Sequence, residues 1–147
     1  MINVLFIALE FPPIQVAGSF RALRFATHLP KHGILPVVVS FNPAQFADSP
    51  IHKVNPAFAK EIPGDTPIYF IDLSAIETGR LPMHPGQISP FRGTHCSTFA
   101  ELFARVATDY DIDLVWATCP PFNVDRIAVA AKQYFRRPLV IDMRDAW

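Results

Sequence analysis

Short, unbroken runs of apolar residues recur along the chain and predict buried strands. The clearest runs cover residues 4–9, 36–41 and 139–142; residues 114–117 have the same character, and the run at 68–71 is weaker. Apolar runs without alternation are typical of parallel strands that are covered on both faces of a sheet. We expect the run at 4–9 to be central, between those at 36–41 and 114–117.

Segments with helical spacing of apolar residues lie between these runs. One covers residues 19–29, with Arg21, Arg24 and His28 on its polar side, and Gly33 follows as a stop signal. A second begins at the capping-box pattern of Thr98 and Glu101, and a third covers residues 121–135. Strands that alternate with helices predict an α/β fold, with a Rossmann-like, doubly wound, mainly parallel sheet and helices on both faces.

The stretch at residues 42–94 differs from the rest of the chain. It holds eight of the fifteen prolines, a density that disfavours long helices and central strands. We interpret it as a surface excursion that carries a short helix near residues 56–62 and the weak strand. No linker divides the chain, so residues 1–147 are expected to form one domain.

Composition and charge narrow the possible functions. Half of the residues are hydrophobic, and thirteen basic residues balance thirteen acidic ones, so no basic excess indicates a nucleic-acid partner. Two cysteines at this spacing form neither a disulfide framework nor a zinc motif. The first apolar run is too short for a signal peptide or a membrane span. We expect a cytoplasmic protein, and attachment to the inner face of the membrane is compatible with these features.

Three loops are expected to meet beyond the carboxyl ends of the strands, where open parallel sheets bind ligands. They cover residues 10–18, 118–121 and 143–147. Gly18 would let a ligand approach the start of the helix near Ser19, where free N–H groups and the helix dipole favour an anion. Arg21, in the first turn, could add a charge-assisted bond, or it could be a solvated surface residue.

The segment at 142–145 places two carboxylates and a guanidinium at the exit of a strand. Arg144 and Asp145 could bind sugar hydroxyls or take part in acid–base chemistry, or they could form a local ion pair. His28 and His32 are not expected to bind a metal because Pro30 interrupts their helix. The sequence has no dinucleotide-binding glycine fingerprint and no P-loop, and we expect neither a metal nor a cofactor.

Four segments, in this order and spacing, resemble those of family 4 glycosyltransferases. They are Val-Leu-Phe-Ile at 4–7 followed by Glu-Phe-Pro-Pro at 10–13, Gly18 and Arg21; residues 55–63; Trp-Ala-Thr-Cys-Pro-Pro at 116–121; and the Asp-x-Arg-Asp-x-Trp segment at 142–147. Together they run almost from one end of the chain to the other.

The resemblance implies a GT-B enzyme of two α/β halves, in which this N-terminal half holds the acceptor. The C-terminal half, absent here, would bind the nucleotide-sugar donor, and the acceptor would be a glycan or a lipid-linked molecule. Gly18 and Arg21 would lie near the donor diphosphate. Thr118, Arg144 and Asp145 would lie on the acceptor side, with Asp145 as the candidate catalytic residue. The first loop has one glycine where the family often has two or three.

Two functions from different classes remain open. The chain could be the N-terminal fragment of a glycosyltransferase for cell-surface polysaccharide or glycan synthesis, inactive by itself. It could instead be a stand-alone binding or interaction domain without catalysis. An oxidoreductase is disfavoured because the glycine fingerprint is missing. Because the chain ends just after the run at 139–142, we also expect an uncovered strand edge that promotes association.

Overall fold

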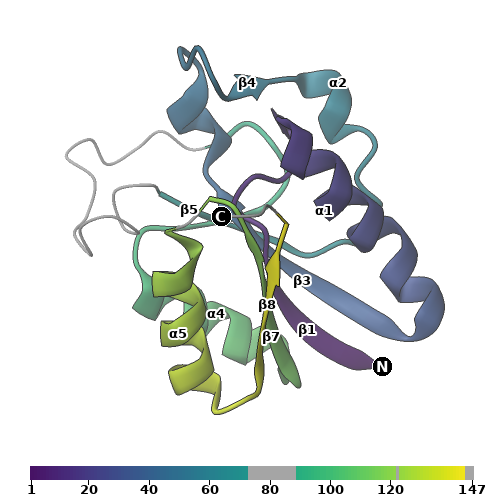
Figure 1. Cartoon of the computed structure of the whole chain (residues 1–147), viewed down its shortest axis with the longest axis vertical. Helices are drawn as coiled ribbons and strands as arrows, with labels where there is room; N and C mark the ends of the chain where they lie inside the picture. The colour runs from purple at the N-terminus through teal and green to yellow at the C-terminus, as the bar shows by residue number, and fades with distance from the viewer. Residues whose placement is uncertain (73–88, 122, 145–147) are drawn as a thin grey trace.

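The computed structural model describes residues 1–72, 89–121 and 123–144 (Figure 1). In these ranges six strands form one sheet in the order β6-β5-β3-β1-β7-β8, and every neighbouring pair is parallel. The strands are β1 (Ile2–Ile7), β3 (Ile34–Phe41), β5 (Ile68–Ile71), β6 (Thr94–Cys96), β7 (Leu114–Cys119) and β8 (Leu139–Met143). The predicted Rossmann-like α/β fold is confirmed, with β1 central between β3 and β7.

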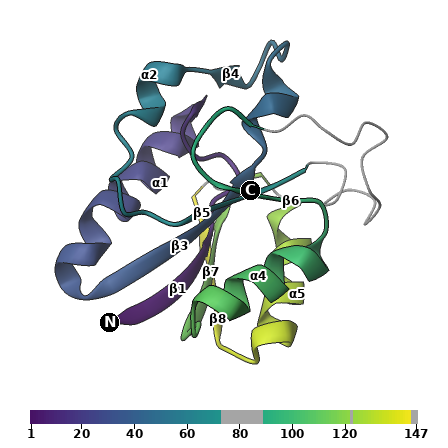
Figure 2. The ribbon, with the colours of Figure 1, turned by 180° about the vertical axis from the view of Figure 1, so that it is seen from behind.

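Helices cover both faces of the sheet, as predicted. Helix α1 (Ala17–His28) lies on one face, and α4 (Phe99–Asp109) and α5 (Val124–Phe135) lie together on the other (Figures 1 and 2). Alternate residues of β1 supply the two cores because successive strand side chains point to opposite faces. Phe6 packs with α1 through Ala22 and Ala26, whereas Leu5 and Ile7 belong to the core that includes Leu102 and Ile127.

The helix boundaries differ from the predicted ones by a few residues. Helix α1 begins at Ala17, two residues earlier than expected, so Arg21 lies in its second turn and not its first. Helix α5 begins at Val124, three residues later than expected. At the start of α4, Thr98 Oγ1 accepts the N–H of Glu101 at 3.1 Å, as the capping box predicts. The Glu101 carboxylate, however, accepts the N–H of Ser97 at 2.9 Å, one residue earlier than in the standard box.

The proline-rich stretch contributes more to the sheet than the sequence indicated. Strand β5 is buried along its whole length, and β6, which was not predicted, pairs with its outer side. A short antiparallel pair joins β2 (Ile14–Gln15) to β4 (Lys53–Val54), and α2 (Pro56–Ala59) follows as the expected short helix. The 3₁₀ turns η1 (Leu29–His32) and η2 (Pro43–Phe46) follow α1 and β3.

Strand β8 corrects one prediction. The run at 139–142 was expected to be buried on both faces, but Val140, Ile141 and Met143 are exposed by 48%, 42% and 46%. The reason is position: β8 is the outermost strand on its side of the described sheet, so it has one strand neighbour, β7. The apolar run therefore predicted a strand correctly, but the prediction that both faces of this strand are buried was wrong.

Candidate functional site

The described parts of the loops named from the sequence meet where the strand order reverses; of the third loop, residues 145–147 lie outside the described residues. From β1 the chain crosses to β3 on one side and later returns to β7 on the other, which places the reversal between β1 and β7. The loop after β1, the carboxyl ends of β7 and β8, and the start of α1 all lie at this edge (Figure 1). This is the position at which open α/β sheets bind ligands.

Arg21 and Asp142 join α1 to β8 through a two-pronged ion pair. Arg21 Nε lies 3.1 Å from Asp142 Oδ2, and Nη2 lies 3.1 Å from Oδ1 and 3.0 Å from Oδ2. Thr118 Oγ1, next to Asp142 in the register, donates to Oδ2 over a long 3.5 Å. The Arg21 guanidinium also lies 4.9 Å from the centre of the Phe25 ring. These contacts orient a side chain that is still half exposed.

Arg144 occupies the position beside Gly18. Its guanidinium packs so closely on this glycine that a Cβ at residue 18 would fall 2.8 Å from Arg144 Cζ. Arg144 Nε donates to Cys119 O at 3.3 Å, Nη2 donates to Pro120 O, and the main-chain N–H donates to Cys119 O at 2.9 Å. The turn after β7 therefore holds this cation against the first turn of α1.

Glu10 and His52 complete the cluster, and the sequence reasoning assigned a site role to neither. Glu10 Oε2 lies 3.9 Å from Arg144 Nη2, and Glu10 Oε1 lies 3.1 Å from His52 Nε2. The two residues are 42 positions apart in the chain, and the β2–β4 pair brings them together. A lone histidine within a proline-rich stretch carries no motif, so only the three-dimensional pairing reveals it.

The sequence-predicted site residues have different outcomes. Gly18, Arg21, Thr118 and Arg144 lie at one edge of the sheet, within a connected set of contacts. The guanidinium at the start of α1, however, belongs to Arg144; Arg21 turns to Asp142 instead. Asp145 lies outside the described residues, so its candidate catalytic role stays a prediction.

A second polar cluster lies at the same edge of the sheet, farther along it. The buried carboxylate of Asp72, which follows β5, accepts a hydrogen bond from Asn42 Nδ2 at 3.0 Å and lies 3.0 Å from His95 Nε2 in β6. Its partners satisfy the buried charge, as burial requires. This arrangement ties the ends of β3, β5 and β6 together.

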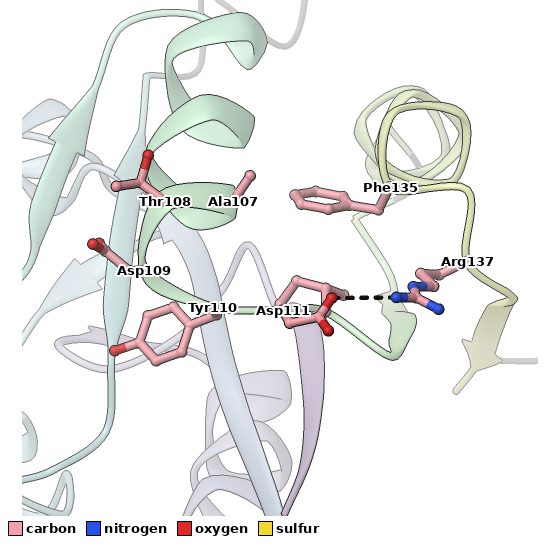
Figure 3. Close-up of a pocket in the computed structure, with 8 residues that line it drawn as sticks. Ala107, Thr108, Asp109, Tyr110, Asp111, Phe135 and Arg137 are labelled. Atoms are coloured by element: carbon pink, nitrogen blue, oxygen red, sulfur yellow. Dashed lines mark hydrogen bonds and ion pairs between the residues drawn. The ribbon is translucent and has the colours of Figure 1, made fainter.

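A hollow of about 380 Å³ lies at the opposite edge, where α4 ends and α5 ends (Figure 3). Its lining includes Phe135, Tyr110 and an ion pair in which Arg137 Nη2 lies 3.2 Å from Asp111 Oδ1. The Asp111 side chain is 88% exposed, so this pair contributes little to stability. The hollow lies away from the carboxyl edge and is a weaker candidate site.

Within residues 1–72, 89–121 and 123–144, no group of three or more histidine, cysteine or acidic side chains could hold a metal ion. In the same described ranges, no helix combines the length and apolar character needed to cross a bilayer.

Neither the models of protein families, nor the curated proteins, nor the solved structures contain a match to this chain.

Proposed function

We propose that this chain is the N-terminal, acceptor-side half of a glycosyltransferase that uses a nucleotide-sugar donor. The observation that carries the proposal is the position of Arg144 beside Gly18. A cation next to the positive end of a helix is electrostatically unfavourable by itself. An anion at this point would be stabilised by both, as a donor diphosphate requires.

Three other features support the same function. The site lies at the reversal of strand order in an all-parallel sheet, where nucleotides bind in open α/β folds. The loop after β1 lacks the glycine fingerprint of dinucleotide enzymes, which disfavours hydride transfer. Polar side chains that could contact sugar hydroxyls, Thr118 and Glu10, lie beside the two arginines.

Sugar transfer tests the proposal directly. Catalysis needs donor and acceptor in one geometry, so the 147-residue chain alone is expected to transfer no sugar. The reading frame is expected to continue into a second α/β half, and the protein with both halves should transfer a labelled sugar from a nucleotide sugar. A gene that encodes no second half would favour the alternative, a stand-alone binding domain. Sugar transfer by residues 1–147 alone would contradict the proposal that donor binding needs a second half.

Anion binding gives a second test on the chain itself. Pyrophosphate and UDP, titrated into the ¹⁵N-labelled chain, are expected to shift the amide signals of Gly18 and Ser19. Arg144→Ala should weaken this binding at least fivefold because it removes the charged partner of the helix end. Arg105→Ala is the matched control, since Arg105 carries the same charge on α4. Equal effects of the two variants would contradict a specific anion site.

A further inference from the structure

His52 is a second polar group at the site to which the proposed function gives no role. It lies between Glu10, which follows β1, and the aromatic ring of Phe46, whose centre is 4.7 Å from the imidazole centre. Its side chain is 24% exposed, so the ring is neither buried in the core nor free in solvent. Such a position allows a ligand to reach the ring while the protein fixes its orientation.

The contact with Glu10 determines which ring nitrogen carries the hydrogen. A carboxylate can only accept, so Nε2, 3.1 Å from Glu10 Oε1, is the donor. In the neutral imidazole Nδ1 then has a free lone pair. Within the described residues Nδ1 has no hydrogen-bond partner, and the atom is not buried. Nδ1 is therefore open to solvent and able to accept a hydrogen bond.

Several contacts hold His52 in this place. Its main-chain N–H donates to Ser49 Oγ at 3.0 Å. The next two residues form β4, which pairs with β2 directly after the loop that carries Glu10. Asn55 then closes the pair, donating from Nδ2 to Gln15 Oε1 at 2.9 Å and from its main-chain N–H to Pro13 O at 2.9 Å. These contacts tie the segment that carries His52 to the loop that carries Glu10.

Glu10 contacts two groups of the site at once. One carboxylate oxygen lies 3.1 Å from His52 Nε2, and the other lies 3.9 Å from Arg144 Nη2. Glu10 therefore links the histidine to the cation beside Gly18 and orients the imidazole ring.

We propose that His52, oriented by Glu10, forms a subsite that binds a hydroxyl group of the acceptor sugar through Nδ1. The inference rests on the proposed function and deepens it, because it places the acceptor on the β2–β4 side of Arg144. A hydroxyl is the matching chemistry, because it can donate a hydrogen bond to Nδ1. Glu10 acts as a positioning residue.

Kinetics of the protein with both halves tests the subsite. His52→Gln keeps an N–H for Glu10 but has no acceptor in place of Nδ1, whereas His52→Asn carries its amide oxygen near the Nδ1 position. We expect His52→Ala and His52→Gln to raise the acceptor KM at least tenfold, with kcat changed less than threefold, and His52→Asn to recover part of the loss. The donor KM should not change. His32→Ala, an exposed histidine on η1, is the control.

The outcomes separate this inference from the proposed function. Unchanged acceptor KM in His52→Gln, or a loss confined to kcat, would overturn the subsite while sugar transfer by the wild type still supports the function. Absence of transfer by the wild type would overturn both. The ring tautomer tests the geometry without transfer: ¹⁵N spectra of the 147-residue chain should show a protonated Nε2, and a protonated Nδ1 would contradict the inference. Glu10→Gln should shift these ring signals, as a positioning role requires.

Discussion

The guanidinium of Arg144 lies directly on Gly18, 126 residues earlier in the chain, and leaves no room for a side chain at that position. A Cβ there would fall 2.8 Å from both Cζ and Nη2 of Arg144. The contact joins the loop after β8 to the start of α1. Glycine fits this position because a larger residue would collide with Arg144, and not because the backbone has a positive φ.

Gly18→Ala is therefore expected to displace the Arg144 guanidinium and to weaken pyrophosphate binding at least fivefold. Stability should change by less than about 1 kcal/mol, because alanine is the better helix residue and the displaced group is the end of a flexible chain. Urea unfolding and the NMR titration measure the two effects. Gly64→Ala is the control, since nothing lies within 4 Å of the added Cβ. Retained binding in Gly18→Ala would show that the contact is incidental.

The Arg21–Asp142 pair is expected to orient the Arg21 side chain and to contribute little to the stability of the fold. Arg21 is 51% exposed, and exposed ion pairs stabilise a fold by about 0–1 kcal/mol. Arg21→Ala should lower the free energy of unfolding by less than about 1 kcal/mol, close to the effect of Arg105→Ala. Arg105 pairs with Glu101 and is exposed by 52%, which makes it a matched control.

Enzyme kinetics should distinguish Arg21 from the control residue Arg105. In the protein with both halves, Arg21→Ala should reduce kcat/KM at least tenfold, and Arg21→Lys should not restore it, because an ammonium cannot reproduce the two-pronged contact. Arg105→Ala should leave kcat/KM within twofold of the wild type. Equal kinetics for all three variants would leave Arg21 with a surface role.

The fold could be predicted from the sequence because its signals are local. Unbroken apolar runs mark β1, β3, β7 and β8, and the spacing of Leu102, Phe103 and Val106 marks α4. The missed strand β6 has three residues, Thr94 to Cys96, which is too short to show any period. The exposed side chains of β8 did not follow from its apolar run, because the number of neighbours of a strand is a property of the whole sheet; the uncovered edge was expected separately, from the position of the run in the chain.

The site could be predicted only where a residue follows a strand or begins a helix. Gly18 begins a helix, Arg144 follows β8, and Thr118 follows the run predicted at 114–117, although the structure extends β7 through it; the rule for parallel sheets therefore placed all three at one edge. The pairing of Arg21 with Asp142, and of Glu10 with His52, depends on which side chains face each other across 121 and 42 residues. No local pattern encodes these distances.

Among the described residues no strand pairs with the outer edge of β8, and this edge is expected to promote association of the chain. Its exposed residues are apolar, and an uncovered strand edge offers unpaired N–H and C=O groups to another chain. Ile141→Lys should lower the weight-average mass seen by light scattering at high concentration. Val129→Lys adds the same charge at a site on α5 with similar exposure, 45% against 42%, and should not. A wild type that remains monomeric at high concentration would contradict the prediction.

The buried hydroxyl of Tyr69 is expected to make the fold sensitive to alkaline pH. Tyr69 is 2% exposed, and its hydroxyl donates to Asp109 Oδ2 at 2.7 Å. Burial first, and then the hydrogen bond to the Asp109 carboxylate, raise the pKa of Tyr69 well above its usual value near 10. Burial likewise raises the pKa of the Cys96 thiol to about 12.

The sign of the pH effect follows from these directions. A group whose pKa is raised on folding stays protonated in the native state, while the unfolded chain releases the proton at lower pH. The stabilisation is therefore complete below pH 9, and it is lost as the pH rises, from about 9 for Cys96 and from about 10 for Tyr69. Each released proton makes the free energy of unfolding fall by up to about 1.4 kcal/mol per pH unit.

Tyr69→Phe isolates the part of this effect that comes from Tyr69. At neutral pH the free energy of unfolding of the variant should be lower by about 1 kcal/mol, because the hydrogen bond to Asp109 is lost. The loss stays small because the exposed Asp109 carboxylate regains water. Above pH 10 its free energy of unfolding should fall less steeply than that of the wild type, so that the two curves converge. Tyr134→Phe, which alters a half-exposed ring on α5, should follow the wild type. Urea unfolding at intervals between pH 7 and 11.5 measures the curves, and parallel curves for wild type and Tyr69→Phe would show that Tyr69 ionises as readily in the fold as in the unfolded chain.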